Sequence, residues 1–120
     1  MSELKRILFV DDDTALLAGL QNVLHRERRR WDMVFASSGE AALAEIRKGR
    51  FDVVISDMRM PQVDGAALFR ILRSESPSTG RIMLSGSDCE SVLGDIDELL
   101  AKPCSASVLR AAIERALARA

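Results

Sequence analysis

The sequence predicts a doubly wound α/β domain with five parallel strands, and three observations support this fold class. Short apolar runs alternate five times with segments of helical periodicity. The runs at 51–56 and 81–85 are almost wholly apolar, which is typical of parallel strands buried on both faces. A chain of 120 residues has room for one such domain, 1–120, with its own core, but not for two ordinary ones.

Five runs rich in Val, Ile, Leu and Phe are expected to form the strands, at 6–10, 31–36, 51–56, 81–85 and 98–102. Amphipathic helices are expected between them and after the last. The first helix would form one apolar face with Leu16, Leu17, Leu20, Val23 and Leu24. The last helix would do the same with Val108, Leu109, Ala112, Ile113 and Leu117.

Polar residues and glycines mark the expected helix ends. Asp13 and Asp64 are suited to cap the first and third helices, and "SSGE" (37–40) and "SDCE" (87–90) resemble capping boxes. Gly49 follows the second helix, where a left-handed cap is expected. The last helix has no stop signal, so we expect the native polypeptide to continue beyond Ala120 and this domain to be a piece of it.

The composition narrows the class of protein. The chain is 48% hydrophobic and 29% charged with a formal net charge of -1, which is typical of a globular domain and not of a nucleic-acid or membrane-surface binder. It has no secretory signal and no apolar stretch of membrane-spanning length. Cys89 and Cys104 are too few for a disulfide framework or a zinc site, so a reducing cytoplasm is expected.

Two local features have plain interpretations. The run "HRERRR" (25–30) invites a nucleic-acid interpretation, but a solvated helix end whose cations favour the negative pole of the dipole is the preferred one. His25, in that run, is expected to be a surface residue and not a phosphoryl carrier. Cys104 would be modestly reactive if exposed at a helix N-terminus, but a packing role is preferred.

Chemically versatile side chains follow the expected strands at their carboxyl ends, where open parallel sheets bind ligands. Asp11 and Asp12 follow the first strand, Asp57 the third, Ser85 ends the fourth, and Lys102 ends the fifth. Carboxylates on neighbouring strands suit Mg²⁺, which would offset their repulsion. One aspartate would then act as a nucleophile toward a phosphoryl group, whose oxygens would be held by Lys102 and Ser85.

Each residue also has a structural explanation. The three aspartates at 11–13 would then serve only as cap and solvated charge, and Asp57 as an acid that opens a turn. Ser85 would be an ordinary strand-end hydroxyl, and Lys102 a surface lysine before a turn proline. Their joint occurrence at matching strand ends favours the site.

The motifs "ILFVDDD" (7–13), "VVISDMRMPQVDG" (53–65), "IMLSG" (82–86) and "AKP" (101–103), in this order, resemble the receiver domain of two-component response regulators. The resemblance covers nearly the whole chain and implies a flavodoxin-like fold with strand order 2-1-3-4-5. It implies that Asp57 is the phospho-acceptor, with Ser85 and Lys102 contacting its phosphoryl group. Mg²⁺ would be bound by Asp11, Asp12, Asp57 and the backbone carbonyl of Arg59, and Asp13 would only cap its helix. The partner would be a histidine kinase or phosphotransfer protein.

The sequence departs from the family's pattern in two places. Leu99 stands three residues before Lys102, where receivers usually carry Tyr or Phe. The sixteen residues 86–101 are fewer than the family normally uses there, so the helix before the last strand is expected to be short, in "ESVLGDID" (90–97). Whether the domain forms a homodimer is open, and any dimer is expected not to use the usual face of fourth helix, fifth strand and fifth helix.

The resemblance implies a phosphorylated signalling switch, which is not an enzyme in the ordinary sense, and three alternatives compete with it. A degenerate receiver would act only through protein contacts, with Leu99 in its favour and the intact acids against it. A Mg²⁺-dependent aspartyl phosphatase would need the pattern D-x-D-x-[T/V], and the corresponding frame here gives Asp11, Asp13 and Ala15. A flavodoxin-like cofactor carrier would need a phosphate loop rich in Ser, Thr and Gly after the first strand, and none is present.

Overall fold

A computed structural model describes residues 4–86, 94, 96–102 and 104–119. The elements follow in the order β1 (Lys5–Val10), α1 (Thr14–Val23), the 3₁₀ turn η1 (His25–Arg29), β2 (Trp31–Ala36), α2 (Gly39–Lys48), β3 (Val53–Asp57), α3 (Gly65–Glu75), β4 (Gly80–Ser85), β5 (Glu98–Ala101) and α4 (Ala106–Arg119). The expected capping box at 87–90, Cys89 and most of the expected short helix at 90–97 lie outside these residues.

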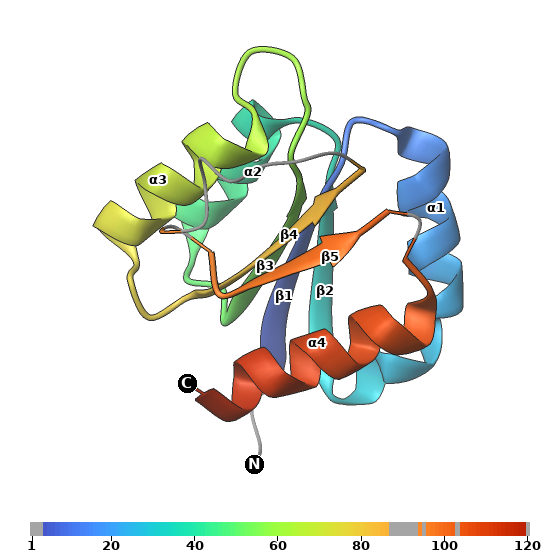
Figure 1. The fold of residues 1–120 in the computed structure, drawn as a ribbon. Coiled ribbons are helices and arrows are strands. Elements are labelled where there is room, and N and C mark those ends of the chain that lie inside the picture. Colours follow the sequence, from blue (N-terminus) through green and yellow to red (C-terminus); the bar gives the residue numbers. More distant parts are fainter. Residues whose placement is uncertain (1–3, 87–93, 95, 103, 120) are drawn as a thin grey trace.

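The five strands form one parallel sheet in the order β2-β1-β3-β4-β5, which confirms the predicted fold class and topology (Figure 1). β3 lies in the centre and all five of its residues are buried, as its apolar sequence predicts. Since all strands run the same way, their carboxyl ends share one edge of the sheet. The loops after β1, β3, β4 and β5 therefore meet at that edge.

Helices cover both faces of the sheet (Figure 1). On one face α1 and α4 pack on Phe9, Ile55 and Leu84. On the other face α2 and α3 pack on Leu8 and Val54, with other strand residues on the same side. Alternate strand residues enter the two cores because successive side chains of a strand point to opposite faces. None of the helices described is long and apolar enough to cross a membrane.

Helix capping agrees with the sequence at two of the sites it predicts. The Asp13 carboxylate accepts a hydrogen bond of 3.1 Å from the Leu16 amide, and that of Asp64 accepts one of 2.8 Å from the Ala67 amide. In "SSGE" the cap of α2 is Ser38, whose hydroxyl accepts from the Ala41 amide at 3.0 Å. The cap is thus one residue later than the S-x-x-E spacing implies.

The prediction for Gly49 is wrong. Its backbone is extended, with φ -179° and ψ 154°, and no glycine described has a positive φ. A Cβ at Gly49 would lie 2.8 Å from Nη1 of Arg6, the far end of a flexible side chain. That guanidinium lies 4.3 Å from the centre of the Phe51 ring and donates to the Arg50 carbonyl.

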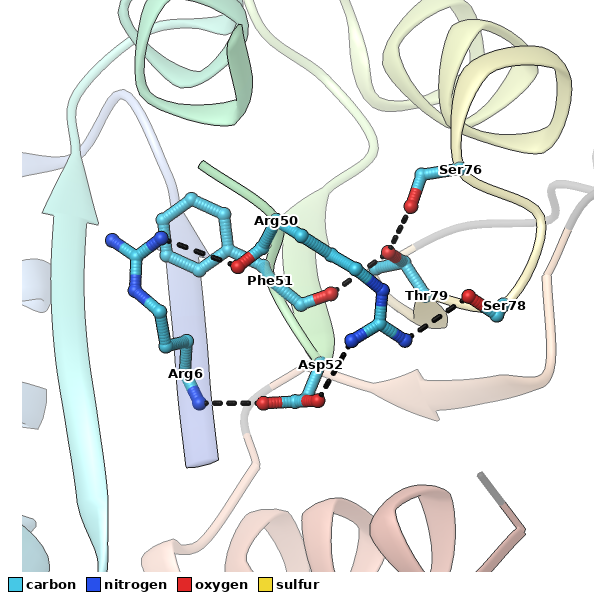
Figure 2. Close-up of polar contacts among 7 residues, drawn as sticks. All are labelled: Arg6, Arg50, Phe51, Asp52, Ser76, Ser78 and Thr79. Atoms are coloured by element: carbon cyan, nitrogen blue, oxygen red, sulfur yellow. Dashed lines mark hydrogen bonds and ion pairs between the residues drawn. The ribbon is translucent and has the colours of Figure 1, made fainter. Parts of the chain in front are cut away.

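β3 begins two residues later than predicted, because Phe51 and Asp52 take part in a polar network at the amino edge of the sheet (Figure 2). The Thr79 hydroxyl donates to the Phe51 carbonyl at 2.8 Å. The Asp52 carboxylate accepts from the Arg6 amide at 2.8 Å and from Arg50 at 3.1 Å. This network joins the starts of β1, β3 and β4.

Candidate functional site at the carboxyl edge of the sheet

The structure brings all the predicted site side chains to the same edge of the sheet. Asp11 and Asp12 directly follow β1, Asp57 and Ser85 are the last residues of β3 and β4, and Lys102 directly follows β5. Backbone bonds continue between neighbouring strands at this edge. The Asp11 amide donates to the Ala36 carbonyl at 3.1 Å, and the Lys102 amide donates to the Ser85 carbonyl at 3.0 Å. The side chains are thus held by the sheet itself rather than by a free loop.

Three carboxylates lie close together. One oxygen from each of Asp11, Asp12 and Asp57 lies within 4.8 Å of the other two. Asp11 and Asp57 are buried, at 2% and 8% exposed, while Asp12 is exposed. Hard oxygen ligands with one open, solvent-facing side suit Mg²⁺, which keeps several of its waters in protein sites. This donor set therefore fits the magnesium site that the sequence predicts.

Lys102 bridges the two buried carboxylates. Its Nζ lies 3.3 Å from Asp11 Oδ2 and 3.3 Å from Asp57 Oδ1. Burial alone would lower the pKa of Lys102, but the charges of Asp11 and Asp57 and its hydrogen bonds to them outweigh burial and raise the pKa. Lys102 therefore stays charged at neutral pH. The sequence predicted Lys102 as a ligand of a phosphoryl group, and its pairing with Asp11 is an additional finding.

The pKa of Asp11 is raised by its place in the cluster. Burial is the main cause that raises the pKa of Asp11, and the nearby charge of Asp57 raises it further. The Asp13 amide, which donates to Asp11 Oδ1 at 2.9 Å, and the charge of Lys102 partly offset this rise. The site is thus short of positive charge, and a bound cation would relieve the deficit. Asp13 itself is not part of the cluster and caps α1, as predicted.

A hollow of about 320 Å³ lies over Asp57. Arg59, Ser85 and Lys102 line it together with Met58 and Gly86. Ser85 is only 7% exposed. The hollow places a hydroxyl, an ammonium and a carboxylate around one space, and a tetrahedral oxyanion attached to Asp57 would find both donors there.

Two glycines that sequence reasoning passed over hold the loop between β3 and α3. A Cβ on Gly65 would lie 2.4 Å from the Asp57 carbonyl oxygen, and a Cβ on Gly39 would lie 2.2 Å from that of Val63. Only glycine allows these approaches. Within the loop, Gln62 has a positive φ of 66°, which is uncommon for a residue with a side chain. The position of Gly65 immediately after the cap Asp64 was the one available signal.

Cys104, although close to the site in sequence, does not join it. Its half-buried side chain packs against the core under α1 and α4, and burial raises the pKa of its thiol. A raised pKa disfavours the reactive thiolate. The packing role preferred from the sequence agrees with this environment.

Known proteins with a similar sequence belong to one family. The model of the response regulator receiver domain family matches residues 7–114. The chain is 32% identical over 120 residues to the alkaline phosphatase synthesis transcriptional regulatory protein PhoP of Bacillus subtilis, covering 96% of this chain and 49% of that protein. It is 35% identical over 120 residues to the transcriptional regulatory protein ZraR of Escherichia coli, covering 93% of this chain and 26% of that protein.

A solved structure has the same fold as this chain. A CheY-like response regulator receiver domain protein from Methanospirillum hungatei superimposes with a TM-score of 0.88 at 28% identity, covering 98% of this chain and 96% of that one. The chain thus spans about half of PhoP and about a quarter of ZraR, but nearly all of the isolated receiver.

Proposed function

The chain belongs to the response regulator receiver family of two-component signal transduction, and from this premise we propose that Asp57 is the residue that accepts the phosphoryl group. The observation that carries the proposal is the position of its carboxylate. It lies at the end of the central strand, 3.3 Å from Lys102 and beside two further carboxylates, under an open hollow. Among the three clustered acids, Asp57 alone lines that hollow.

The proposed reaction is a transfer between proteins. Receiver domains are phosphorylated by histidine kinases, and a kinase or a phosphotransfer protein would present a phosphohistidine to the hollow. An oxygen of Asp57 attacks the phosphorus, so that a P–O bond forms while the P–N bond breaks and the imidazole leaves with the bonding electrons. In the dephosphorylation that ends the signal, water attacks the same phosphorus and releases inorganic phosphate and the free carboxylate of Asp57. These self-directed steps make the domain a switch rather than an enzyme with a separate substrate.

Magnesium would be held by Asp11, Asp12, Asp57 and the backbone carbonyl of Arg59. The family binds Mg²⁺ at an acidic pocket, and the close carboxylate oxygens of this chain support the same use here. When bound, the ion supplies positive charge that neutralises the incoming phosphoryl oxygens. Asp12, as the exposed member of the cluster, keeps the site open to the solvent from which the ion enters.

Lys102 and Ser85 would stabilise the phosphorylated state. Lys102 already contacts Asp57, so its ammonium is placed to move onto a phosphoryl oxygen without a long displacement. Ser85 lines the same hollow and would donate its hydroxyl to another oxygen. Ser85 is the last residue of β4. A movement of Ser85 toward the phosphoryl group would therefore change the conformation of the chain that follows it, and with it the surface that binds partner proteins.

Several further expectations stay proposals. We infer a cytoplasmic domain that forms part of a longer regulator, whose output the chain does not reveal. Leu99 is 41% exposed, which leaves the position normally taken by an inward-turning aromatic ring without a buried side chain. We also keep the proposal, which rests on the short segment 86–101, that any homodimer avoids the face of fourth helix, fifth strand and fifth helix.

The experiment is intact-protein mass spectrometry after incubation with acetyl phosphate, a small phosphoryl donor that needs no kinase. We expect one phosphoryl adduct on the wild type with Mg²⁺, and none without Mg²⁺ or in Asp57→Ala. A matched control is Asp13→Asn, which removes an acid next to the cluster but outside it and should keep the adduct. An adduct that persists in Asp57→Ala would contradict the proposal, and its absence from folded wild-type protein would favour the degenerate receiver.

A further inference from the structure

A strongly basic surface lies at the amino edge of the sheet, opposite the carboxylate site. The segment 25–30, here called the basic turn, contains four arginines and His25, and it immediately precedes β2 (Figure 1). His25 and all four arginines are exposed. The sequence led us to expect a solvated helix end, but the structure shows a separate 3₁₀ turn, η1, after the end of α1. The proposed phosphorylation makes no use of this turn.

The arginines of the basic turn differ in whether they pair with a carboxylate. Glu27, its one acid, binds Arg30 Nε at 2.7 Å through one oxygen and lies 2.9 Å from Arg110 Nε through the other. Arg30 also binds Glu114 at 2.8 Å. Both oxygens of the Glu27 carboxylate are therefore paired, one with Arg30 and the other with Arg110 of α4.

The other three arginines, at 26, 28 and 29, differ from Arg30. Among the described residues they have no carboxylate partner, and the one bond seen is from Arg28 to the His25 carbonyl at 3.1 Å. Three exposed guanidinium groups on one short turn repel one another unless an anion lies between them. Cations left without partners in this way form a surface suited to a negatively charged partner.

A hollow of about 290 Å³, lined by both apolar and polar side chains, adjoins the basic turn. Its apolar lining residues are Leu4, Trp31, Met33 and Phe35, and Gln21, His25 and Arg28 also line it. Asp32 is the one acid among the described residues that line it, and Arg6 Nε binds that carboxylate at 3.3 Å. This volume is at the small end of the range for ligand pockets, and it fits one apolar side chain better than a cofactor.

From this combination we propose that the surface docks an acidic segment of a partner protein that inserts one apolar side chain into the hollow. The arginines would bind the carboxylates, and the hollow would bury the anchor, in the usual arrangement of an apolar centre with a charged rim. A nucleic-acid backbone would use the arginines but leave the apolar walls exposed. A membrane would need several protruding apolar groups, whereas of the described apolar residues that line the hollow Leu4 is exposed, at 43%, and Met33 and Phe35 are half-buried.

The proposal is independent of the phosphorylation chemistry. The basic turn precedes β2, whereas Asp57 ends β3, so the two surfaces lie at opposite edges of the parallel sheet. Docking should therefore have the same affinity in Asp57→Ala as in the wild type. A failure of one proposal leaves the other untouched.

The test uses a synthetic peptide of glutamates with one central phenylalanine, titrated into the whole chain. Trp31 is the only tryptophan and lies at the hollow with the Arg30 guanidinium 4.3 Å from its ring centre, so its emission reports occupancy directly. We expect saturable binding with a change in Trp31 emission. Replacing the peptide phenylalanine by serine should weaken binding about tenfold, the equivalent of one buried apolar side chain.

Two triple variants separate the surface from general charge. Arg26→Glu/Arg28→Glu/Arg29→Glu should weaken binding by about tenfold or more. Arg47→Glu/Arg70→Glu/Arg119→Glu makes the same change in net charge at exposed arginines elsewhere and should leave binding within about twofold. Equal losses in both variants, or no binding by the wild type, would overturn the proposal. So would binding of a DNA duplex or of phosphatidylserine vesicles without binding of the peptide.

Discussion

The same substitution, glycine to alanine, should have opposite effects at two positions of this chain. Gly65 is the first residue of α3, and a Cβ there would lie 2.4 Å from the Asp57 carbonyl oxygen and 3.0 Å from Met58 Cα and from Met83 Sδ. Gly19 lies in the middle of α1, and a Cβ there would meet nothing within 4 Å. Gly19→Ala therefore serves as the matched control for Gly65→Ala.

The magnitudes follow from these contacts. Two of the three atoms near Gly65 are backbone atoms of the loop that carries the site, so they cannot turn aside as a flexible side chain would. Forcing one methyl group into such a place typically costs about 1–3 kcal/mol, and we expect about 2 kcal/mol here. Gly19→Ala should instead stabilise the chain by up to about 1 kcal/mol, the difference in helix propensity between the two residues.

Urea unfolding followed by the fluorescence of Trp31 measures both effects. Trp31 is the only tryptophan and is 2% exposed, so its emission reports the loss of the core. With a slope of about 2 kcal/mol/M, the midpoint should fall by about 1 M in Gly65→Ala and rise by up to about 0.5 M in Gly19→Ala. Gly65→Ala should also give less acetyl phosphate adduct, because its methyl group displaces Asp57. A Gly65→Ala midpoint at or above that of the wild type would refute the packing argument.

Three further effects should be measurable in the same unfolding assay. Gln62→Gly should stabilise the chain by about 0.5–1 kcal/mol, because it relieves the positive φ at some cost in unfolded-state entropy; an unchanged or lower midpoint would contradict the strain. The pKa of Asp11 is raised on folding, so without Mg²⁺ its contribution to stability declines as pH rises from the ordinary range of an aspartate through the raised value. The free energy of unfolding of Asp11→Asn minus that of the wild type should therefore increase from pH 4 to pH 7. A difference that stays constant over this range would count against a shifted pKa. Mg²⁺ at 100 times its dissociation constant should add about 2.7 kcal/mol to the wild type, and under the same conditions far less to Asp12→Asn.

Much of the fold was predictable because its signals are local. Buried strands such as 81–85 carry a continuous apolar run, and caps such as Asp13 and Asp64 act within their own helix turn. The site was predictable for a related reason. Parallel strands bring their carboxyl ends together whatever the sequence between them, so Asp57 and Lys102 had to share an edge once the strands were assigned.

The features that sequence reasoning missed depend on contacts between distant residues. Gly49 is extended and lies beside the guanidinium of Arg6, 43 positions earlier in the chain, and no local pattern carries that information. The start of β3 is shifted by the bonds of Asp52 to Arg6 and Arg50. The bond from Lys102 to Asp11 was missed because each residue already had another expected role.

The most direct test of the central claim is to locate the phosphoryl group among the clustered aspartates. Borohydride reduces an aspartyl phosphate to the alcohol homoserine with release of phosphate, so peptide mapping after treatment with acetyl phosphate and Mg²⁺ identifies the acceptor by its changed mass. We expect homoserine at position 57 and unmodified aspartate at 11, 12 and 13. Homoserine at 11 or 12, with Asp57 intact, would contradict the assignment of the nucleophile on which the proposed function rests.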